Sequence, residues 1–353
     1  MIFKREEDID PGVYFIATYH LSSSTSLKDA AWELAIGQSV GNPHVRNAWE
    51  TDELFENHSC KVIGDEVEMN KVKDGIVRIA FPTINTHWRE DGISHLLCQV
   101  MGGQVDIKGI LSCRLLDLQF PKAVLQDLGF EPKYGLIGMK NYCGVEEGKP
   151  LLGGIIKPKT GITPEVLLAM VKELVEGGVN FIKEDEIMSD FPLCPIEKRV
   201  PLIMDYIKSS GRNVVYCVCI NADYPFVIDR VKKVYELGGN GVHINFWCGL
   251  GVYRAVRALD LPLFIHYQQS GSKILTERTH RYSIDFNVLC QLAGMSGVDT
   301  MHIGNLFGYS SETEEDIKQY MNTLHAHNVV PALSCGMHPG IVNAVTATVG
   351  SSY

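Results

Sequence analysis

The sequence predicts a two-domain α/β protein, in which an N-terminal α+β domain of the ferredoxin-like type precedes a (β/α)8 TIM barrel. Its 353 residues suit two domains or one large barrel. Strand and helix patterns first follow the order β-α-β-β-α-β, and short apolar runs then alternate with helical segments. We expect the domains at residues 1–145 and 150–353, with the boundary in the turn-rich residues 142–150.

The elements of the first domain follow from hydrophobic periodicity. A β-branched and aromatic run between turn signals predicts a strand at residues 12–19. Apolar residues at helical spacing behind a serine-rich start predict a helix at residues 27–36. The remaining expected elements are a hairpin of strands at residues 60–69 and 75–81, a helix at 92–100 and a strand at 107–118. That order is the ferredoxin-like split βαβ pattern.

Seven short apolar runs after residue 150 predict the barrel strands, because each is followed by a helical segment and they lie roughly 30 residues apart. The runs begin near Gly154, Phe181, Val214, Gly241, Leu263, Thr300 and Pro331. A barrel is favoured over a doubly wound sheet because no GxGxxG or P-loop motif follows any run.

The eighth strand of the barrel is missing from this pattern, since the seventh run is followed by a helix beginning near Pro339 and then by the chain end. We therefore expect a fragment, truncated before strand eight. Unpaired strand edges would leave the 353-residue form poorly soluble or inactive compared with a longer one.

Composition and charge limit the classes of binding partner and the cellular location that we expect. There are 32 Lys and Arg against 42 Asp and Glu, and the net charge of −10 disfavours nucleic acids and anionic lipids. No apolar stretch of about 18 residues occurs, and the N-terminus is charged from residue 4, so we expect a cytoplasmic protein without membrane attachment. Ten scattered cysteines lack metal-binding spacing and are expected to be reduced thiols.

The predicted strand near Phe181 ends in a charged cluster. Alternation along a strand places Lys183 and Asp185 on one face, and the turn beyond lets Glu186 approach them. Two carboxylates can hold a hard divalent ion such as Mg²⁺, with room for water, substrate oxygens and one further anion. The alternative is a solvated charge run at a strand end.

The first predicted barrel strand ends in two lysines, Lys157 and Lys159, on either side of Pro158. Both ammonium groups are expected at the barrel mouth, where a lysine shielded from water beside a second cation can act as a base. A solvated basic turn is the alternative. The carboxylate cluster on the next strand favours the catalytic interpretation.

Further polar residues follow later runs. His266 and His302 are expected at strand ends facing the site, whereas His243 lies inside a run and is interpreted as a core residue. Ser334 and Gly336 follow the seventh run, with the hydroxyl and flexible backbone that barrels use to bind phosphate.

Residues 154–161, GIIKPKTG, and 177–186, GGVNFIKEDE, resemble the two signature motifs of the large subunit of ribulose bisphosphate carboxylase/oxygenase (RuBisCO) and its relatives. The resemblance extends over most of the chain. It implies a CO₂-derived carbamate on Lys183 that binds Mg²⁺ together with Asp185 and Glu186. It also implies proton transfer by Lys157 and Lys159, His266 lining the site, and substrate phosphate held by His302, Ser334 and Gly336.

Four positions depart from the carboxylase pattern. Tyr309 stands where a mobile-loop lysine stabilises the carboxylated intermediate, and Tyr267 replaces a phosphate-binding arginine. Gly37 and Gly103 stand where the N-terminal domain lends side chains to the partner subunit's site. The chain therefore resembles a RuBisCO-like protein of the non-carboxylating class (form IV), expected as a homodimer whose N-terminal domain covers the partner's barrel.

The resemblance implies Mg²⁺-dependent enolisation of a phosphorylated small molecule. Because both lysines are retained and one phosphate contact is lost, we expect a 1,3-proton transfer on a ketose monophosphate, as in a 5-methylthioribulose-1-phosphate isomerase of methionine salvage. One alternative is a decarboxylase of the 3-oxo-isoapionate-4-phosphate type. Another is a diketo-methylthiopentyl-phosphate enolase, although its base would stand at Gly103. A catalytically inert regulatory relative is the non-enzyme alternative.

Overall fold

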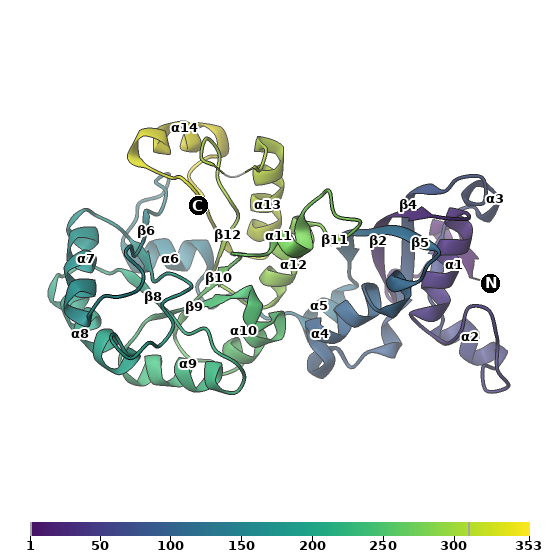
Figure 1. Cartoon of the computed structure of the whole chain (residues 1–353), viewed down its shortest axis with the longest axis horizontal. Helices are drawn as coiled ribbons and strands as arrows, with labels where there is room; N and C mark the ends of the chain where they lie inside the picture. Colours follow the sequence, from purple (N-terminus) through teal and green to yellow (C-terminus); the bar gives the residue numbers. More distant parts are fainter. Residues whose placement is uncertain (1, 310) are drawn as a thin grey trace. The chain divides into compact units, whose positions relative to one another are not determined.

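The computed structural model describes residues 2–309 and 311–353, which form two compact units (Figure 1). One unit comprises the residues up to Gly129 together with Lys273–Leu289, and the other comprises Phe130–Ser272 and Cys290–Tyr353. This division differs from the expected boundary at residues 142–150. Helix α6 (Gly135–Cys143) belongs to the barrel unit because its Met139 joins a buried cluster of barrel side chains.

The first unit is built on a mixed six-stranded sheet in the order β1-β3-β4-β2-β5-β11. Its strands are β1 (Phe3–Lys4), β2 (Tyr14–Ser23), β3 (Lys61–Ile63), β4 (Asp74–Pro82), β5 (Ile110–Gln119) and β11 (Tyr282–Ile284). Its helices include α1 (Leu27–Gly37), α2 (Asp52–His58), α3 (Glu66–Met69), α4 (Trp88–Val100), α5 (Lys122–Leu128) and α11 (Lys273–Thr276). Strand β2 pairs antiparallel with both β4 and β5, which confirms the predicted ferredoxin-like arrangement.

Local sequence explains both the agreement and a difference in this unit. Buried and half-buried residues alternate along β2, and Ser26 caps α1 by accepting a hydrogen bond from the backbone of Asp29. The strand expected at residues 60–69 stops at Ile63 instead. Asp65 accepts hydrogen bonds from the backbone amides of Val67 and Glu68 and so starts helix α3.

The second unit is a nearly closed parallel barrel of seven strands in the order β13-β12-β10-β9-β8-β7-β6. The strands are β6 (Gly153–Ile155), β7 (Phe181–Lys183), β8 (Val215–Cys219), β9 (Gly241–Asn245), β10 (Phe264–Gln268), β12 (Thr300–His302) and β13 (Val330–Ala332). Each of the seven predicted runs is a strand. All neighbouring pairs are parallel, so the carboxyl ends of the strands meet at one mouth.

Helices cover the outside of this sheet, as Figure 1 shows for α7 to α10. The helices of the barrel unit besides α6 are α7 (Pro164–Glu176), α8 (Ile196–Ser209), α9 (Phe226–Glu236), α10 (Leu250–Arg257), α13 (Glu314–Ala326) and α14 (Pro339–Val349). Helix α12 (Phe286–Met295) spans both units. In α7, Thr163 caps the start and Pro164 occupies the first turn, while Leu167, Val171 and Val175 are buried at the four-residue spacing of one helix face.

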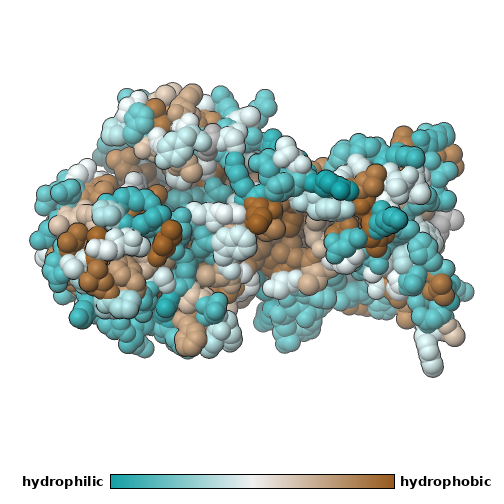
Figure 2. Space-filling view, viewed as in Figure 1, coloured by the Kyte–Doolittle hydropathy of each residue, from teal (hydrophilic) through white to brown (hydrophobic). Residues whose placement is uncertain are grey.

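The visible surface is largely hydrophilic, with scattered apolar residues (Figure 2). Exposed apolar side chains include Trp49 and Tyr309, which are 86% and 85% exposed. Within the described residues, none of the helices is long and apolar enough to cross a bilayer. The ten cysteines form no disulfide.

Candidate active site

Strand β7 brings the predicted charged cluster together at the mouth of the barrel. Lys183 is completely buried and Asp185 nearly so, whereas the side chain of Glu186 is about a quarter exposed. Nζ of Lys183 lies 3.6 Å from Oε2 of Glu186. This amine has no hydrogen-bond partner among the described residues. Lys183 and Asp185 are therefore buried, unlike the members of a solvated charge run.

The residue between these ligand candidates, Glu184, points to a different set of partners. Arg199 of α8 donates from Nε to Oε1 at 2.7 Å and from Nη2 to Oε2 at 2.9 Å. The hydroxyl of Tyr216 and the backbone amide of Cys219 donate to the same carboxylate, at 2.5 and 2.7 Å. These bonds fasten the end of β7 to α8 and β8, which fixes the direction of Lys183 and Asp185. The sequence did not indicate this role, because Glu184 read as one more charge in a run.

Both candidate lysines reach the same carboxylate. Lys157 forms an ion pair with Oδ2 of Asp185, and Nζ of Lys159 lies 3.6 Å from Oδ1. Their side chains are 57% and 39% exposed, so the expectation of lysines shielded from water is wrong. Strand β6 ends at Ile155, two residues before Lys157, and the chain beyond it carries both amines over the mouth.

The pKa values in the cluster follow from burial and from these ion pairs. Burial lowers the pKa of Lys183, against the opposing pull of Glu186 and Asp185. Burial alone would raise the pKa of Asp185, but the hydrogen bond from Lys157 and the charges of Lys157 and Lys159 hold it below its usual range. The Asp185 carboxylate thus faces the two ammonium groups of Lys157 and Lys159. It also lies beside the amine of Lys183, whose neutral form burial favours.

The histidines lie deeper than expected. His266 is the middle residue of β10 rather than its end, because the strand continues to Gln268. Its ring is completely buried, 4.6 Å from the ring of His302 and 5.6 Å from that of His243. Burial lowers the pKa of all three well below the ordinary value. His302 ends β12 as predicted, and His243 is a buried residue whose Nδ1 lies 3.0 Å from the carbonyl of Glu184.

Two of the three predicted phosphate residues, Ser334 and Gly336, lie in the loop after β13, whereas His302 ends β12. The amide of Ser334 donates to the carbonyl of Gly304 at 2.9 Å, so this loop rests on the loop after β12. Gly336 has φ +96°, which favours glycine, and a Cβ there would meet the ring of Tyr309 at 2.9 Å. The hydroxyl of Ser334 lies 3.9 Å from Sγ of Cys335, and its backbone amide is already bonded to Gly304.

Sequence reasoning missed two residues of this mouth. Gln268 ends β10, and its amide Nε2 lies 3.4 Å from Oε2 of Glu186. Asn221 follows β8 by two residues and donates from Nδ2 to the carbonyl of Glu186 at 2.8 Å. Alternation along β10 from His266 would have pointed to Gln268. No comparable signal marked Asn221.

The residues present fit a Mg²⁺ ion held by Asp185, Glu186 and a modified Lys183. Among the described residues, no group of three or more His, Cys, Asp or Glu side chains is arranged to hold a metal, so two carboxylates alone do not complete a site. A third anion fits at Lys183, because its amine is buried, unpartnered and adjacent to Glu186. The neutral amine, which burial favours, is the form that combines with CO₂.

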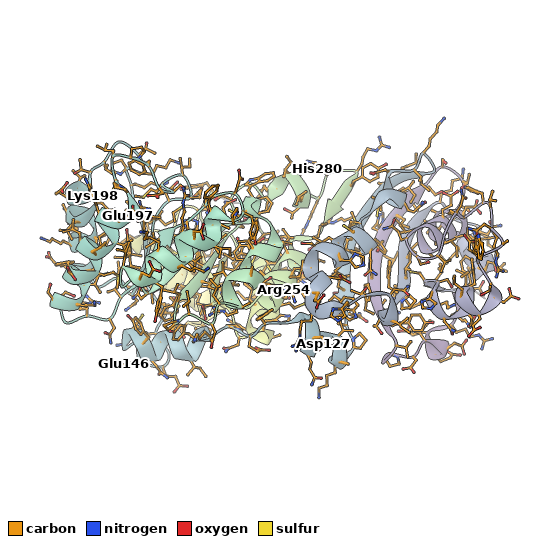
Figure 3. The ribbon with its side chains drawn as sticks, turned by 90° about the horizontal axis from the view of Figure 1, so that it is seen from below. Asp127, Glu146, Glu197, Lys198, Arg254 and His280 are labelled. Carbon is orange, nitrogen blue, oxygen red and sulfur yellow. The ribbon has the colours of Figure 1, made fainter. Side chains whose placement is uncertain are left out.

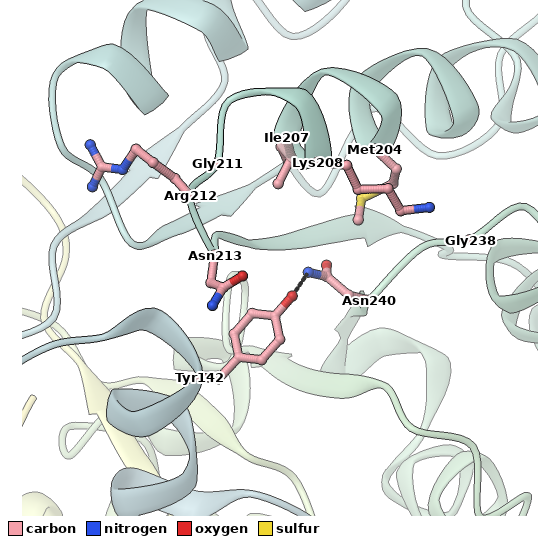
Figure 4. Close-up of a pocket in the computed structure, with 9 residues that line it drawn as sticks. All are labelled: Tyr142, Met204, Ile207, Lys208, Gly211, Arg212, Asn213, Gly238 and Asn240. Carbon is pink, nitrogen blue, oxygen red and sulfur yellow. Dashed lines mark hydrogen bonds between the residues drawn. The ribbon is translucent and has the colours of Figure 1, made fainter.

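A pocket of about 380 Å³ lies at the opposite end of the barrel (Figure 4). Its lining includes Asn213 and Asn240, which precede β8 and β9, and none of the predicted site residues. Asn240 donates to the hydroxyl of Tyr142 at 2.9 Å and to the carbonyl of Val214 at 2.8 Å. These bonds tie α6 to the start of β8, which is a structural role.

Comparison with known proteins identifies the family of this chain. Residues 6–124 match the ribulose bisphosphate carboxylase large chain, N-terminal domain, and residues 138–345 match the catalytic domain of the same large chain. The chain belongs to the RuBisCO large-chain family. It is 29% identical to a ribulose bisphosphate carboxylase-like protein of Archaeoglobus fulgidus, over 98% of this chain and 82% of that protein.

Other members of the RuBisCO family are similarly related. A 3-oxo-isoapionate-4-phosphate decarboxylase of Rhizobium rhizogenes is 30% identical, over 82% of this chain and 72% of its own length. The crystal structure of an octameric RuBisCO from Pyrococcus horikoshii OT3 superposes with a TM-score of 0.86 at 26% identity. That superposition covers 99% of this chain and 83% of the other.

The four departures from the RuBisCO carboxylase pattern occupy different environments. Tyr309 is exposed, and a side chain at Gly103 would meet open space. A Cβ at Gly37 would meet the side chain of Gln104 at 2.1 Å. Tyr267 is completely buried and stacks on Tyr253 of α10 at 4.7 Å, so it does not reach the mouth where a phosphate would bind.

Proposed function

We propose that this RuBisCO-family chain is a non-carboxylating, Mg²⁺-dependent enzyme that moves a proton next to a carbonyl group of a phosphorylated ketose. The first candidate is a 1,3-proton transfer of the 5-methylthioribulose-1-phosphate isomerase type, in sulfur or methionine salvage. The observation that carries the proposal is the unpartnered, buried amine of Lys183 beside Glu186, with two exposed lysines on Asp185.

Asp185, Glu186 and the Lys183 carbamate would hold Mg²⁺, which when bound would polarise the substrate carbonyl and make the neighbouring C–H bond acidic. Lys157 or Lys159 would take the proton after losing its own proton to solvent, because only the neutral amine can accept one; both side chains lie at the open mouth within reach of Asp185. The same lysine, or its neighbour, returns the proton to a second carbon of the substrate. The two amines thus suit a transfer that needs one proton removed and one delivered.

The substrate phosphate is assigned to the loops after β12 and β13. His302 is neutral because burial lowers its pKa, so it would contribute a hydrogen bond rather than a charge. The hydroxyl of Ser334 and the backbone of Gly336, which has φ +96°, would complete this binding region. We also propose a homodimer in which the N-terminal unit of one chain covers the barrel of the other.

Decarboxylation is the second candidate, because the 30% identity to a 3-oxo-isoapionate-4-phosphate decarboxylase covers most of this chain. The same cation site would stabilise the enolate that remains when CO₂ leaves. The test is to incubate the purified protein with Mg²⁺ and bicarbonate, separately with 5-methylthioribulose 1-phosphate and with 3-oxo-isoapionate 4-phosphate. An isomeric product without CO₂ supports the isomerase, CO₂ release supports the decarboxylase, and no product from either contradicts the proposal.

A further inference from the structure

Glu186 belongs to a closed ring of hydrogen bonds at the mouth of the barrel. Its other members are neutral and come from the ends of three neighbouring strands, β8, β9 and β10. We call this set the amide ring; it consists of Glu186, Asn221, Asn245, Ser270 and Gln268.

The ring holds Glu186 at two points. Asn221 donates to the backbone carbonyl of Glu186 at 2.8 Å, and Gln268 Nε2 donates to its carboxylate at 3.4 Å. The two amides are linked to each other by Asn245 and Ser270. The backbone amide of Asn245 donates to Oδ1 of Asn221 at 2.8 Å, its side chain donates to the carbonyl of Ser270 at 3.1 Å, and Gln268 also donates to the Ser270 hydroxyl.

The ring is anchored to the barrel wall. The backbone carbonyl of Asn221 accepts hydrogen bonds from the hydroxyl of Ser189 at 2.7 Å and from Nη1 of Arg230 on α9 at 2.5 Å. Gln268 is 5% exposed, and its Oε1 has no hydrogen-bond partner among the described residues.

We propose that Gln268 and Asn221 are positioning residues that hold Glu186 toward Lys183 as a ligand of the divalent cation. Glu186 is the most exposed of the three ligand candidates, and without the ring its side chain could turn to solvent. Because the other members are neutral, they orient the carboxylate without competing for its charge, as lysine or arginine would. This inference rests on the cation site of the proposed function.

The test measures Mn²⁺ binding by electron paramagnetic resonance, in bicarbonate buffer and without substrate. Gln268→Leu and Asn221→Ala should each weaken Mn²⁺ binding about 10-fold, the lower end for residues that orient a metal ligand. Gln269→Leu is the matched control, because this neighbouring amide accepts a hydrogen bond from Ser272 and makes none to Glu186. It should bind Mn²⁺ as the wild type does.

A double-mutant cycle separates positioning of Glu186 from a general structural role. In a Glu186→Gln background, adding Gln268→Leu should weaken Mn²⁺ binding no further, because the carboxylate that it orients is gone. The inference is overturned if Gln268→Leu weakens Mn²⁺ binding equally in both backgrounds. It is also overturned if neither Gln268→Leu nor Asn221→Ala weakens Mn²⁺ binding in the wild-type background. A wild-type protein that binds no Mn²⁺ overturns the cation site itself, whereas Mn²⁺ binding without turnover removes only the proposed reaction.

Discussion

Lys157 forms an ion pair with Asp185, so a candidate base and a candidate cation ligand are in direct contact. Under the proposed function, a divalent cation bound to Asp185 would replace Lys157 in neutralising the negative charge of this carboxylate. The side chain of Lys157 would then be free to turn toward the substrate of the proposed reaction, next to Lys159. The proposed function therefore predicts that cation binding and release of Lys157 from Asp185 are coupled.

Replacing Lys157 should separate the two roles. In Lys157→Met we expect proton exchange on the substrate to fall at least about 100-fold, the usual contribution of a positioned base. Mn²⁺ binding should be retained or strengthened, because a competing cation has left Asp185. Lys149→Met is the control, since Lys149 pairs at 2.7 Å with the exposed Glu146. Loss of Mn²⁺ binding in Lys157→Met would show that this lysine supports the cation rather than competing with it.

The buried pair of Arg199 and Glu184 should dominate the local stability of β7. Arg199→Ala leaves an unpaired carboxylate in the core, and we expect a loss of about 3–5 kcal/mol in the free energy of unfolding. Lys233→Ala removes the partner of Glu197, which Figure 3 shows on the outer side of α8, and should cost no more than about 1 kcal/mol. Urea titration measures the free energy of unfolding of both variants. Equal losses would contradict a dominant role for the buried pair of Arg199 and Glu184.

The buried histidines predict a loss of stability in mild acid. His243, His266 and His302 stay neutral in the folded protein because burial lowers their pKa, whereas the unfolded chain binds protons below about pH 6.5. Stability therefore falls as the pH drops through this value. Each histidine contributes a slope of up to about 1.4 kcal/mol per pH unit.

Substitution of one histidine should reduce that slope. His243→Gln is expected to flatten the dependence of the unfolding free energy on pH between pH 6 and 5, while His44→Gln, at an exposed position, should leave it unchanged. Urea titrations across this range give the slope directly. If the two variants have the same slope, His243 is not held neutral by the fold.

We expect no carboxylation of ribulose bisphosphate, and Tyr309→Lys alone should not create it. An exposed lysine at this position would supply one cation, but three other contacts of the carboxylase pattern would still be missing, at Gly37, Gly103 and Tyr267. Incorporation of labelled CO₂ into acid-stable product is the measurement. Fixation above background by either protein would show that these departures do not decide the activity.

Much of the fold could be predicted because the spacing of apolar residues along the sequence indicates which residues are buried. The seven barrel strands and the helix at Pro339 begin within a residue or two of the predicted positions, since each is a buried run bounded by turn residues. Helix α3 was missed because its start depends on one capping residue, Asp65. Strand β11 was missed because it pairs with β5, far away in the sequence.

In the candidate site, too, residues on one strand end could be predicted to meet, whereas contacts between distant segments could not. Lys183, Asp185 and Glu186 could be predicted to meet because they share one strand end. Lys157 and Asp185 could be expected to lie close together because they follow the neighbouring parallel strands β6 and β7. The depth of His266, the outward direction of Tyr267 and the amide ring depend on where β10 ends and on bonds between loops. Local sequence does not encode those contacts.

The most direct test of the central claim is the exchange of substrate protons with solvent deuterium, followed by NMR in D₂O with 5-methylthioribulose 1-phosphate, Mg²⁺ and bicarbonate. The wild type should exchange a proton next to the carbonyl, and exchange should stop when Mg²⁺ is chelated or CO₂ is removed. Lys183→Ala should fold, as shown by a cooperative melt, and should not exchange. Exchange by Lys183→Ala at the wild-type rate, or its persistence without CO₂, would contradict the role assigned to Lys183.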